Sequence, residues 1–360
     1  MLLKNNLSEK TRKLIKITIV ILISLLLVFA WMLSRKHTCT SVKEPSLTNG
    51  IWLTASVTMS NNKTDLWMID ADTQKSKRLI SDRNVMISGK VNSSGDMLLY
   101  SDAIGNGPWD IFKYNIATNE TYQITDDTLG QFNLHFGDDK GNVILSKSGG
   151  KNSPIPQISV INLNKKIANF LELDSGMGVQ DFDVYNNKVI VLAFSFEEFI
   201  NKKFKENDPF SKITYSIIEM NIDGSNKKML SQLNAINLDS ISFLSDGNSV
   251  LLGGSGINDD EKGFYKLNLI QNQLDTLLIE KQLQDAGKIE QISQPLIAGI
   301  SSDEKNLYFS AIPIGTEEID ILGLSVFPNA IYQYNFESKE VTEIFKIKDS
   351  FISSISFTYK

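Results

Sequence analysis

The chain has 360 residues, of which 42% are hydrophobic, with two histidines and a single cysteine. A hydrophobic fraction near the globular average excludes a disordered chain, and one cysteine excludes a scaffold built on disulfides. Residues 1–43 hold eight Lys/Arg and one Glu, a net charge of +7, so residues 44–360 carry −13 of the total of −6. This division indicates two zones with different surroundings.

The first feature along the chain is an uncharged apolar segment, residues 17–33, with the sequence ITIVILISLLLVFAWML. As a helix it covers roughly 25 Å, close to the thickness of a membrane core. Five basic residues precede it and three follow it within ten positions, which places the N-terminus in the cytoplasm. We expect a basic cytoplasmic tail (1–16), a single-pass signal anchor (17–33), a linker (34–49) and an extracytoplasmic remainder at the cell membrane.

Two alternatives to an uncleaved anchor are a cleaved signal peptide and a lipoprotein. A signal peptide has an apolar region of about 7–15 residues followed by small residues, whereas Ser34-Arg35-Lys36-His37 follows this segment. Lipid attachment at Cys39 requires small apolar residues before it, and Lys36-His37-Thr38 does not fit. We therefore interpret Cys39 as a free thiol at the membrane surface, with an intermolecular disulfide as the alternative.

The remainder of the chain repeats one unit of four short strands. The third strand of each unit ends in Asp or Asn, which favours the turn that follows. These strands read DLWMID (65–70), DIFKYN (110–115), QISVIN (157–162), SIIEMN (216–221), GFYKLN (263–268) and AIYQYN (330–335). Each is followed by a short turn and a fourth strand, and is preceded by a hairpin such as VNSSGDMLLYSD (91–102) or SFLSDGNSVLLGG (242–254). Four strands in roughly 45 residues is the period of a β-propeller blade.

The two ends of the repeat region determine the number of blades. Residues 51–55 form the strand directly before the third strand of the first unit, so the first unit lacks its innermost strand. The chain finishes with FISSISFTYK (351–360), an alternating apolar strand outside the other units. If this strand completes the first unit, six blades close without an open sheet edge. The predicted fold class is all-β: a six-bladed β-propeller over residues 50–360, closed by the C-terminal strand.

The repeats DLWMIDADTQKSKRLI, DIFKYNIATNETYQIT and SDGNSVLL (245–252) resemble those of TolB-type, WD40-like propellers over residues 50–360. The resemblance implies the propeller architecture, and it implies little about function because such repeats occur in translocation accessories, peptidases, lyases and other membrane proteins. TolB-type proteins carry a separate α/β domain before the propeller, and residues 1–49 are too few for one. Heavy use of lysine with only four arginines is typical of a bacterium with an AT-rich genome.

Loop lengths indicate which face of the propeller is functional. Turns between strands one and two, and between three and four, are short and share one face. The loops on the opposite face include three long segments, 196–214, 279–297 and 312–329. Long loops beyond the needs of the scaffold commonly carry binding sites, so we expect binding on this face.

Two of these segments are predicted to be partly ordered. Phe196, Phe199, Ile200 and Phe204 follow helical spacing, and residues 319–327, including Phe327, are strongly apolar. Both either pack across the central channel as a cap or form an exposed apolar patch for a protein or a membrane surface. Trp109 in GNGPWD (105–110) is either an aromatic platform for a sugar or a core residue beside its blade.

Few residues suit catalysis. His135, the only histidine after residue 43, occupies an inner-strand position typical of a structural residue, and G-x-S-x-G and zinc patterns are absent from the sequence. Gly253-Gly254-Ser255-Gly256 resembles only part of the first pattern. The abundant reactive groups are loop carboxylates, among them Asp259, Asp260, Glu317 and Glu318. They suit solvation, with a glycosidase-like pair or a Ca²⁺ site as alternatives.

We therefore expect a membrane-anchored propeller that binds another protein or a component of the cell envelope, without catalysis and with no cofactor. A charge of −13 outside the membrane argues against nucleic acid as a partner. The candidate binding residues are Trp109, Phe199, Asp259, Asp260, Glu317, Glu318 and Phe327. One alternative is a carbohydrate-active enzyme, a lyase or hydrolase that uses acidic loop residues. Another is a surface sensor with a 16-residue cytoplasmic tail.

Overall fold

The computed structural model describes residues 50–83, 88–103, 107–126, 129–138, 140–150, 153–164, 167–205, 208–257, 261–321 and 323–360. The predicted tail, membrane segment 17–33 and linker lie outside the described residues. Within the ranges given above, helices are too short or too polar to cross a membrane. Contacts group the chain from Asn49 to Lys360 into one compact unit.

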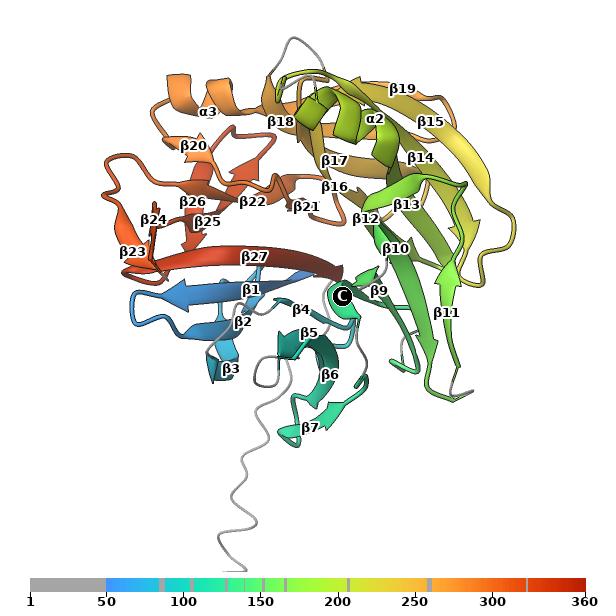
Figure 1. Cartoon of the computed structure of the whole chain (residues 1–360). Helices are drawn as coiled ribbons and strands as arrows, with labels where there is room; N and C mark the ends of the chain where they lie inside the picture. Colours follow the sequence, from blue (N-terminus) through green and yellow to red (C-terminus); the bar gives the residue numbers. More distant parts are fainter. Residues whose placement is uncertain are drawn as a thin grey trace, which may run out of the picture. The chain divides into compact units, whose positions relative to one another are not determined.

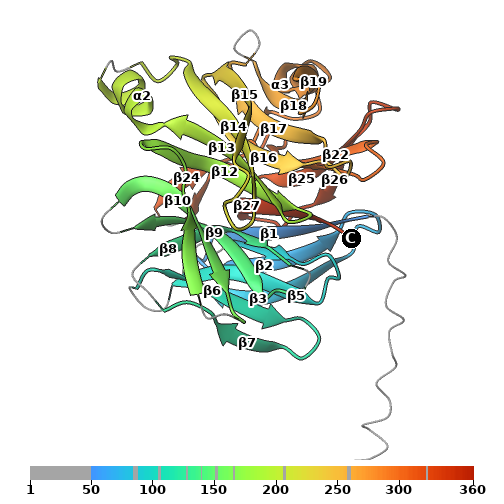
Figure 2. The same ribbon diagram turned by 90° about the vertical axis from the view of Figure 1, so that its right-hand side faces the viewer.

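This unit is the predicted all-β propeller, built from antiparallel four-stranded blades. In Figures 1 and 2 the sheets follow one another in chain order around a ring. Blade one contains β27 (Ser350–Tyr359), β1 (Ile51–Met59), β2 (Thr64–Asp70) and β3 (Ser76–Arg83). Blade two contains β4 (Ser88–Val91), β5 (Met97–Ala103), β6 (Trp109–Asn115) and β7 (Glu120–Gln123).

Blades three to five repeat this order, each from its innermost to its outermost strand. Blade three contains β8 (Gly130–Phe136), β9 (Val143–Gly150), β10 (Ser153–Asn162) and β11 (Ile167–Leu171). Blade four contains β12 (Met177–Tyr185), β13 (Lys188–Ser195), β14 (Ile213–Asn221) and β15 (Lys228–Ala235). Blade five contains β16 (Asn237–Phe243), β17 (Ser249–Ser255), β18 (Lys262–Asn268) and β19 (Gln273–Ile279).

Blade six has an interrupted inner strand, because two short strands both pair with the second strand. Its strands are β20 (Gln291–Ile292), β21 (Ala298–Ile300), β22 (Asn306–Ile312), β25 (Ala330–Asn335) and β26 (Val341–Phe345). A separate hairpin, β23 (Ile319–Ile321) and β24 (Leu324–Val326), is inserted between β22 and β25. The third and fourth strands expected from the repeat therefore all form.

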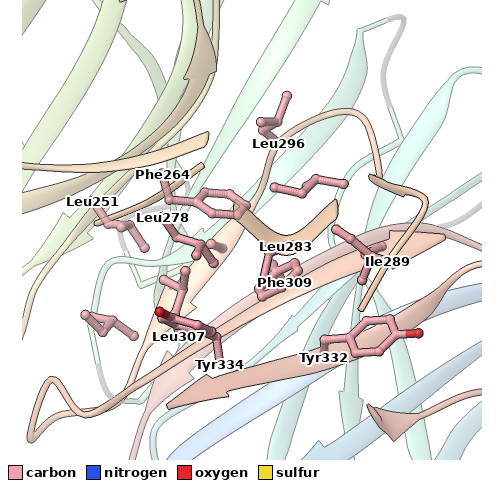
Figure 3. Packing of buried hydrophobic residues seen from close by; sticks show 14 of the residues in the cluster. Leu251, Phe264, Leu278, Leu283, Ile289, Leu296, Leu307, Phe309, Tyr332 and Tyr334 are labelled. Carbon is pink, nitrogen blue, oxygen red and sulfur yellow. The ribbon is translucent and has the colours of Figure 1, made fainter. Parts of the chain in front are cut away.

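The core consists of six hydrophobic clusters, each of which joins two successive blades. Strand β13 shows why its sequence is continuously apolar. Ile190 and Leu192 point into the cluster shared with blade five, whereas Val189 and Val191 point into the cluster shared with blade three. Successive side chains of a strand face opposite sides, so a strand buried between two blades requires apolar residues at every position. Figure 3 shows the cluster between blades five and six.

The C-terminal strand closes the ring as predicted. β27 pairs with β1 from Ile51–Tyr359 to Met59–Ser350, and a cluster with Ile352 and Ile355 joins blade one to blade six. The Lys360 ammonium lies 2.9 Å from the Asp70 carboxylate and 4.2 Å from the centroid of the Trp52 ring. The closing strand is therefore held by sheet pairing, apolar packing and a buried terminal cation.

The segment before blade six differs from the long loop that we expected. It contains α3 (Glu280–Asp285), whose Leu283 is buried in the cluster of Figure 3. A six-residue helix with one buried apolar position is too short to show a helical periodicity in the sequence. The helix predicted around Phe199 does form, as α2 (Phe196–Ile200) followed by a π-turn, η1 (Asn201–Lys205).

Candidate functional site: the loop face and the central channel

The propeller has two faces with different chemistry. The short turns that join strands one and two, and strands three and four, lie on one face, which we call the turn face. The loops that join strands two and three, and those that join successive blades, lie on the opposite face, which we call the loop face. The chain enters β1 on the turn face, where the Gly50 carbonyl oxygen accepts a hydrogen bond from the Lys360 N–H.

Exposed apolar side chains gather on the loop face. Among the described residues, ten large apolar side chains are markedly exposed. Six of them belong to loop-face segments: Phe132, Phe204, Phe210, Ile314, Leu324 and Phe327. Only Ile270 lies in a turn-face segment, and the remaining three lie on outer strands. Phe204 and Phe210 share the blade-four insertion, and Ile314, Leu324 and Phe327 share the blade-six insertion, so each insertion exposes more than one apolar residue, as interaction surfaces often do.

Hydrogen bonds hold the described parts of the blade-four insertion (residues 196–205 and 208–212). Ser195 caps α2 by accepting a hydrogen bond from the Glu198 N–H at 3.2 Å. Lys203 donates to the carbonyl oxygens of Pro209 and Ser211 at 2.7 and 2.6 Å, which closes the segment on itself. π-turns often occur at functional positions, and η1 lies in this insertion.

Its aromatic residues have different surroundings. Phe199, a predicted binding residue, packs on Phe194 with ring centroids 5.2 Å apart and belongs to the edge of the core. Phe204 and Phe210 are instead 66% and 76% exposed. The helical spacing thus identified the correct segment, but Phe199 anchors it while Phe204 and Phe210 form its exposed surface.

The blade-six insertion (residues 312–329) is the hairpin β23–β24. Ser325 on β24 donates a hydrogen bond to the Glu318 carboxylate, while Glu317 is exposed. Leu324 and Phe327 are 61% and 40% exposed. The described residues of the two insertions are not among those that line the two cavities of the central channel.

Trp109 is the first residue of β6 and not part of a loop. It is half-buried against the cluster between blades one and two, and its ring lies 5.5 Å from that of Phe132. Phe132 lines the channel cavity on the loop face, so Trp109 supports a residue of the channel rim. Asp259 and Asp260 lie outside the described residues. Across the described part of the chain, His, Cys, Asp and Glu do not gather in threes as metal ligands would.

The channel contains two cavities. One, of about 420 Å³, is lined by the loop-face ends of the inner strands, including Phe132, Asp181 and Asp239. The other, of about 580 Å³, is lined by their turn-face ends and Lys360. Lys90, Asp183, Ser242 and Phe357 line both cavities and mark the waist between them.

Buried carboxylates in the channel wall link successive blades. Asp181 and Asp183 of blade four accept hydrogen bonds from the Ile241 and Phe243 N–H groups of blade five, at 2.8 and 2.9 Å. Asp239 of blade five accepts one from the Leu296 N–H of blade six at 2.8 Å. These carboxylates thus provide acceptors for backbone N–H groups that do not pair within the sheets.

Burial perturbs the ionisation of these groups. It raises the pKa of Asp181 to about 6 and also raises the pKa of Asp239. Burial acts in the same direction on Asp183, but the Lys90 cation and His135 outweigh it and hold the pKa of that carboxyl well below its usual range. Burial, reinforced by Lys90, lowers the pKa of His135 to about 4, so the ring is neutral at pH 7.

The sequence analysis missed this channel network except for His135. Its signal in the sequence is the occurrence of Asn133, Asp181, Asp183 and Asp239 within inner strands that also carry buried apolar residues, such as Leu134, Phe182 and Ile241. The Gly253–Gly256 segment has a packing role instead. A Cβ at Gly253 would overlap the Leu296 carbonyl oxygen, so glycine is required where blade six approaches β17.

Comparison with known proteins supports the fold. No family model matches this sequence, and no curated protein matches it. The structure is similar to TolB from Acinetobacter baumannii, in its C-terminal propeller, with a TM-score of 0.59 and 11% identity over 88% of this chain and 67% of that one. It is also similar to a chain of a nidogen/laminin complex, with a TM-score of 0.50 and 12% identity over 86% of this chain and 98% of that one. An oligogalacturonate lyase in complex with manganese matches at a TM-score of 0.47 and 12% identity, over 83% of this chain and 74% of that one. The resemblance to TolB-type repeats is thus confirmed at the level of the six-bladed propeller.

Proposed function

We propose that this protein is a non-catalytic binding module that recognises another protein or a component of the cell envelope through its loop face. In this proposal residues 17–33 hold it in the cell membrane, with the propeller on the extracytoplasmic side. The observation that carries the proposal is the gathering of exposed apolar side chains on the loop face. Ordered insertions present them, and a rigid scaffold with projecting loops is a common arrangement for recognition.

The channel supports this proposal better than catalysis. Asp181, Asp183 and Asp239 are each held by a backbone N–H of the following blade. Their hydrogen bonds account for them as links between blades. Phe204, Phe210 and Leu324 on the loop face instead expose more than half of their surface, although the Phe204 ring also meets that of Phe199 at a centroid distance of 5.7 Å. A partner that covers these side chains would remove their apolar area from water, and this burial would favour binding.

The test is capture from a detergent-solubilised envelope by the full chain carrying an N-terminal affinity tag. We expect the wild-type protein to retain a reproducible protein or envelope polymer. The double variant Phe204→Ser/Phe210→Ser should lose it. Ile270→Ser, an equally exposed change on the turn face, is the matched control and should retain it.

A glycan-cleavage screen on the same preparation, with and without a chelator, addresses the carbohydrate-active alternative. Product formation that the chelator abolishes would refute a binding-only function. Equal capture by the wild-type protein and the Phe204/Phe210 double variant would refute the loop face as the binding surface.

A further inference from the structure

Three charged or titratable side chains from three blades meet at the waist of the channel. Lys90 of β4, His135 of β8 and Asp183 of β12 form a triangle. The Lys90 Nζ lies 3.0 Å from the His135 Nδ1 and 3.3 Å from the Asp183 Oδ1, and the last two atoms are 3.0 Å apart. The pair of Lys90 and Asp183 therefore reaches from blade two to blade four, and both residues line both cavities.

The surroundings of His135 determine its tautomer. The Asn133 side chain donates from its Nδ2 to the Asp181 carboxylate, so its Oδ1 faces the imidazole, 3.2 Å from the His135 Nε2. A neutral ring therefore carries its hydrogen on Nε2 and offers the Nδ1 lone pair to the Lys90 ammonium. In this state the Asp183 Oδ1 lies beside a lone pair from which it receives no hydrogen bond.

A second proton on the ring reverses this arrangement. An imidazolium donates from both nitrogens, and an acceptor already stands at each: the Asp183 Oδ1 at Nδ1 and the Asn133 Oδ1 at Nε2. Lys90 then loses the Nδ1 lone pair as an acceptor, shares the Asp183 Oδ1 with the ring and faces a positive charge. The ammonium and the imidazolium compete for one carboxylate, and the imidazole ring is held against the Phe182 ring, with ring centroids 4.5 Å apart.

We propose that Lys90, His135 and Asp183 form a proton-operated latch across the channel. Protonation of His135 Nδ1 by solvent releases Lys90 into the lumen and joins the two cavities. The other titratable groups around the latch are Asp181 of β12, Lys147 of β9 and Tyr359 of β27. Asp183 stays ionised through the transition, because its pKa is held low, and so remains the acceptor that receives the imidazolium.

The first test is a titration of the full chain labelled with ¹⁵N-histidine in a zwitterionic detergent. The chain has only two histidines, and the His37→Gln variant assigns their signals. Lys90→Met should raise the pKa of His135 by about one unit or more, because it removes an adjacent cation and leaves Asp183 in place. Lys90→Arg should keep the pKa low. An unchanged titration in Lys90→Met would overturn the proposal.

The second test follows Lys90 itself with lysine labelled at ¹³Cε and a neutral, soluble paramagnetic relaxation agent. The Lys90 signal, assigned with Lys90→Arg, should be shielded from the agent at pH 7 and broadened as His135 titrates. The signal of Lys188, whose side chain is 48% exposed, should be broadened throughout. In His135→Gln the response of Lys90 to pH should disappear, with near-ultraviolet circular dichroism confirming the fold. Equal broadening of Lys90 at both pH values, or a response that persists in His135→Gln, would overturn the latch.

Discussion

The inner strands and the loop-face insertions of this propeller use polar and apolar residues in opposite ways. The inner strands bury carboxylates, and each of those carboxylates is bonded to the next blade. The insertions expose apolar residues, and the Lys203 hydrogen bonds that close the blade-four insertion lie within that segment. Unusual residues in the first region therefore maintain the ring, whereas unusual residues in the second are available to a partner. Changes in the two regions should consequently have separable effects on stability and on binding.

The largest effect should come from removing the strand that closes the ring. Deletion of residues 351–360 exposes the edge of β1 and removes the buried side chains of Ile352 and Ile355. We expect the cooperative unfolding transition to be lost, as measured by differential scanning calorimetry. An unchanged transition temperature would contradict the closure of blade one by β27.

A second change tests the links between blades. Asp183→Leu removes the carboxylate that pairs with Lys90 and leaves the buried Phe243 N–H without its acceptor, so the free energy of unfolding should fall by about 1–3 kcal/mol in urea denaturation. Asp223→Asn, in an exposed turn on the turn face, is the control and should leave the unfolding curve unchanged. A small loss in Asp183→Leu would show that the buried carboxylates do not maintain the ring.

The pH dependence of stability tests the same region. His135 has a pKa of about 4 in the folded protein, against 6.5 for a free ring, so the unfolded chain takes up the proton first. The contribution of His135 to the free energy of unfolding is fully present above pH 6.5. It falls by on the order of 3 kcal/mol as the pH decreases to 4. Asp181 opposes it, because its raised pKa makes the folded state take up a proton first below pH 6.

The variant His135→Gln separates these two contributions. In this variant the free energy of unfolding should no longer fall between pH 6.5 and 4. It should rise instead, since the Asp181 contribution remains. Urea denaturation at four or five pH values compares the two proteins. Parallel pH profiles for the wild-type protein and His135→Gln would contradict the account of the channel network.

The smallest effect on stability should come from the loop face. Phe204→Ser should change the free energy of unfolding by less than about 0.5 kcal/mol, because the ring is mostly exposed. Phe199→Ser, five residues earlier, should cost about 2–3 kcal/mol, because this ring packs on the core. Thermal unfolding of the two variants checks the contrast, and similar losses in both would show that the insertion belongs to the core.

The sequence was sufficient to predict the fold, because each blade repeats one pattern of strands and turns. The pairing of FISSISFTYK (351–360) with β1 followed from the missing inner strand at the start. The site was less predictable. Helical spacing located the blade-four insertion, but it could not show that Phe199 turns inward while Phe204 turns outward. The meeting of Lys90, His135 and Asp183 depends on the closure of inner strands far apart in the chain, which has no local signature.

Hydrogen–deuterium exchange of the full chain, with and without the solubilised envelope, tests the central claim most directly. The account predicts that binding protects peptides from residues 196–212 and 312–329 on the loop face. It also predicts unchanged exchange in the turn-face hairpins around residues 92–96 and 245–248. Protection confined to the turn face, with the loop-face peptides unchanged, would contradict the account.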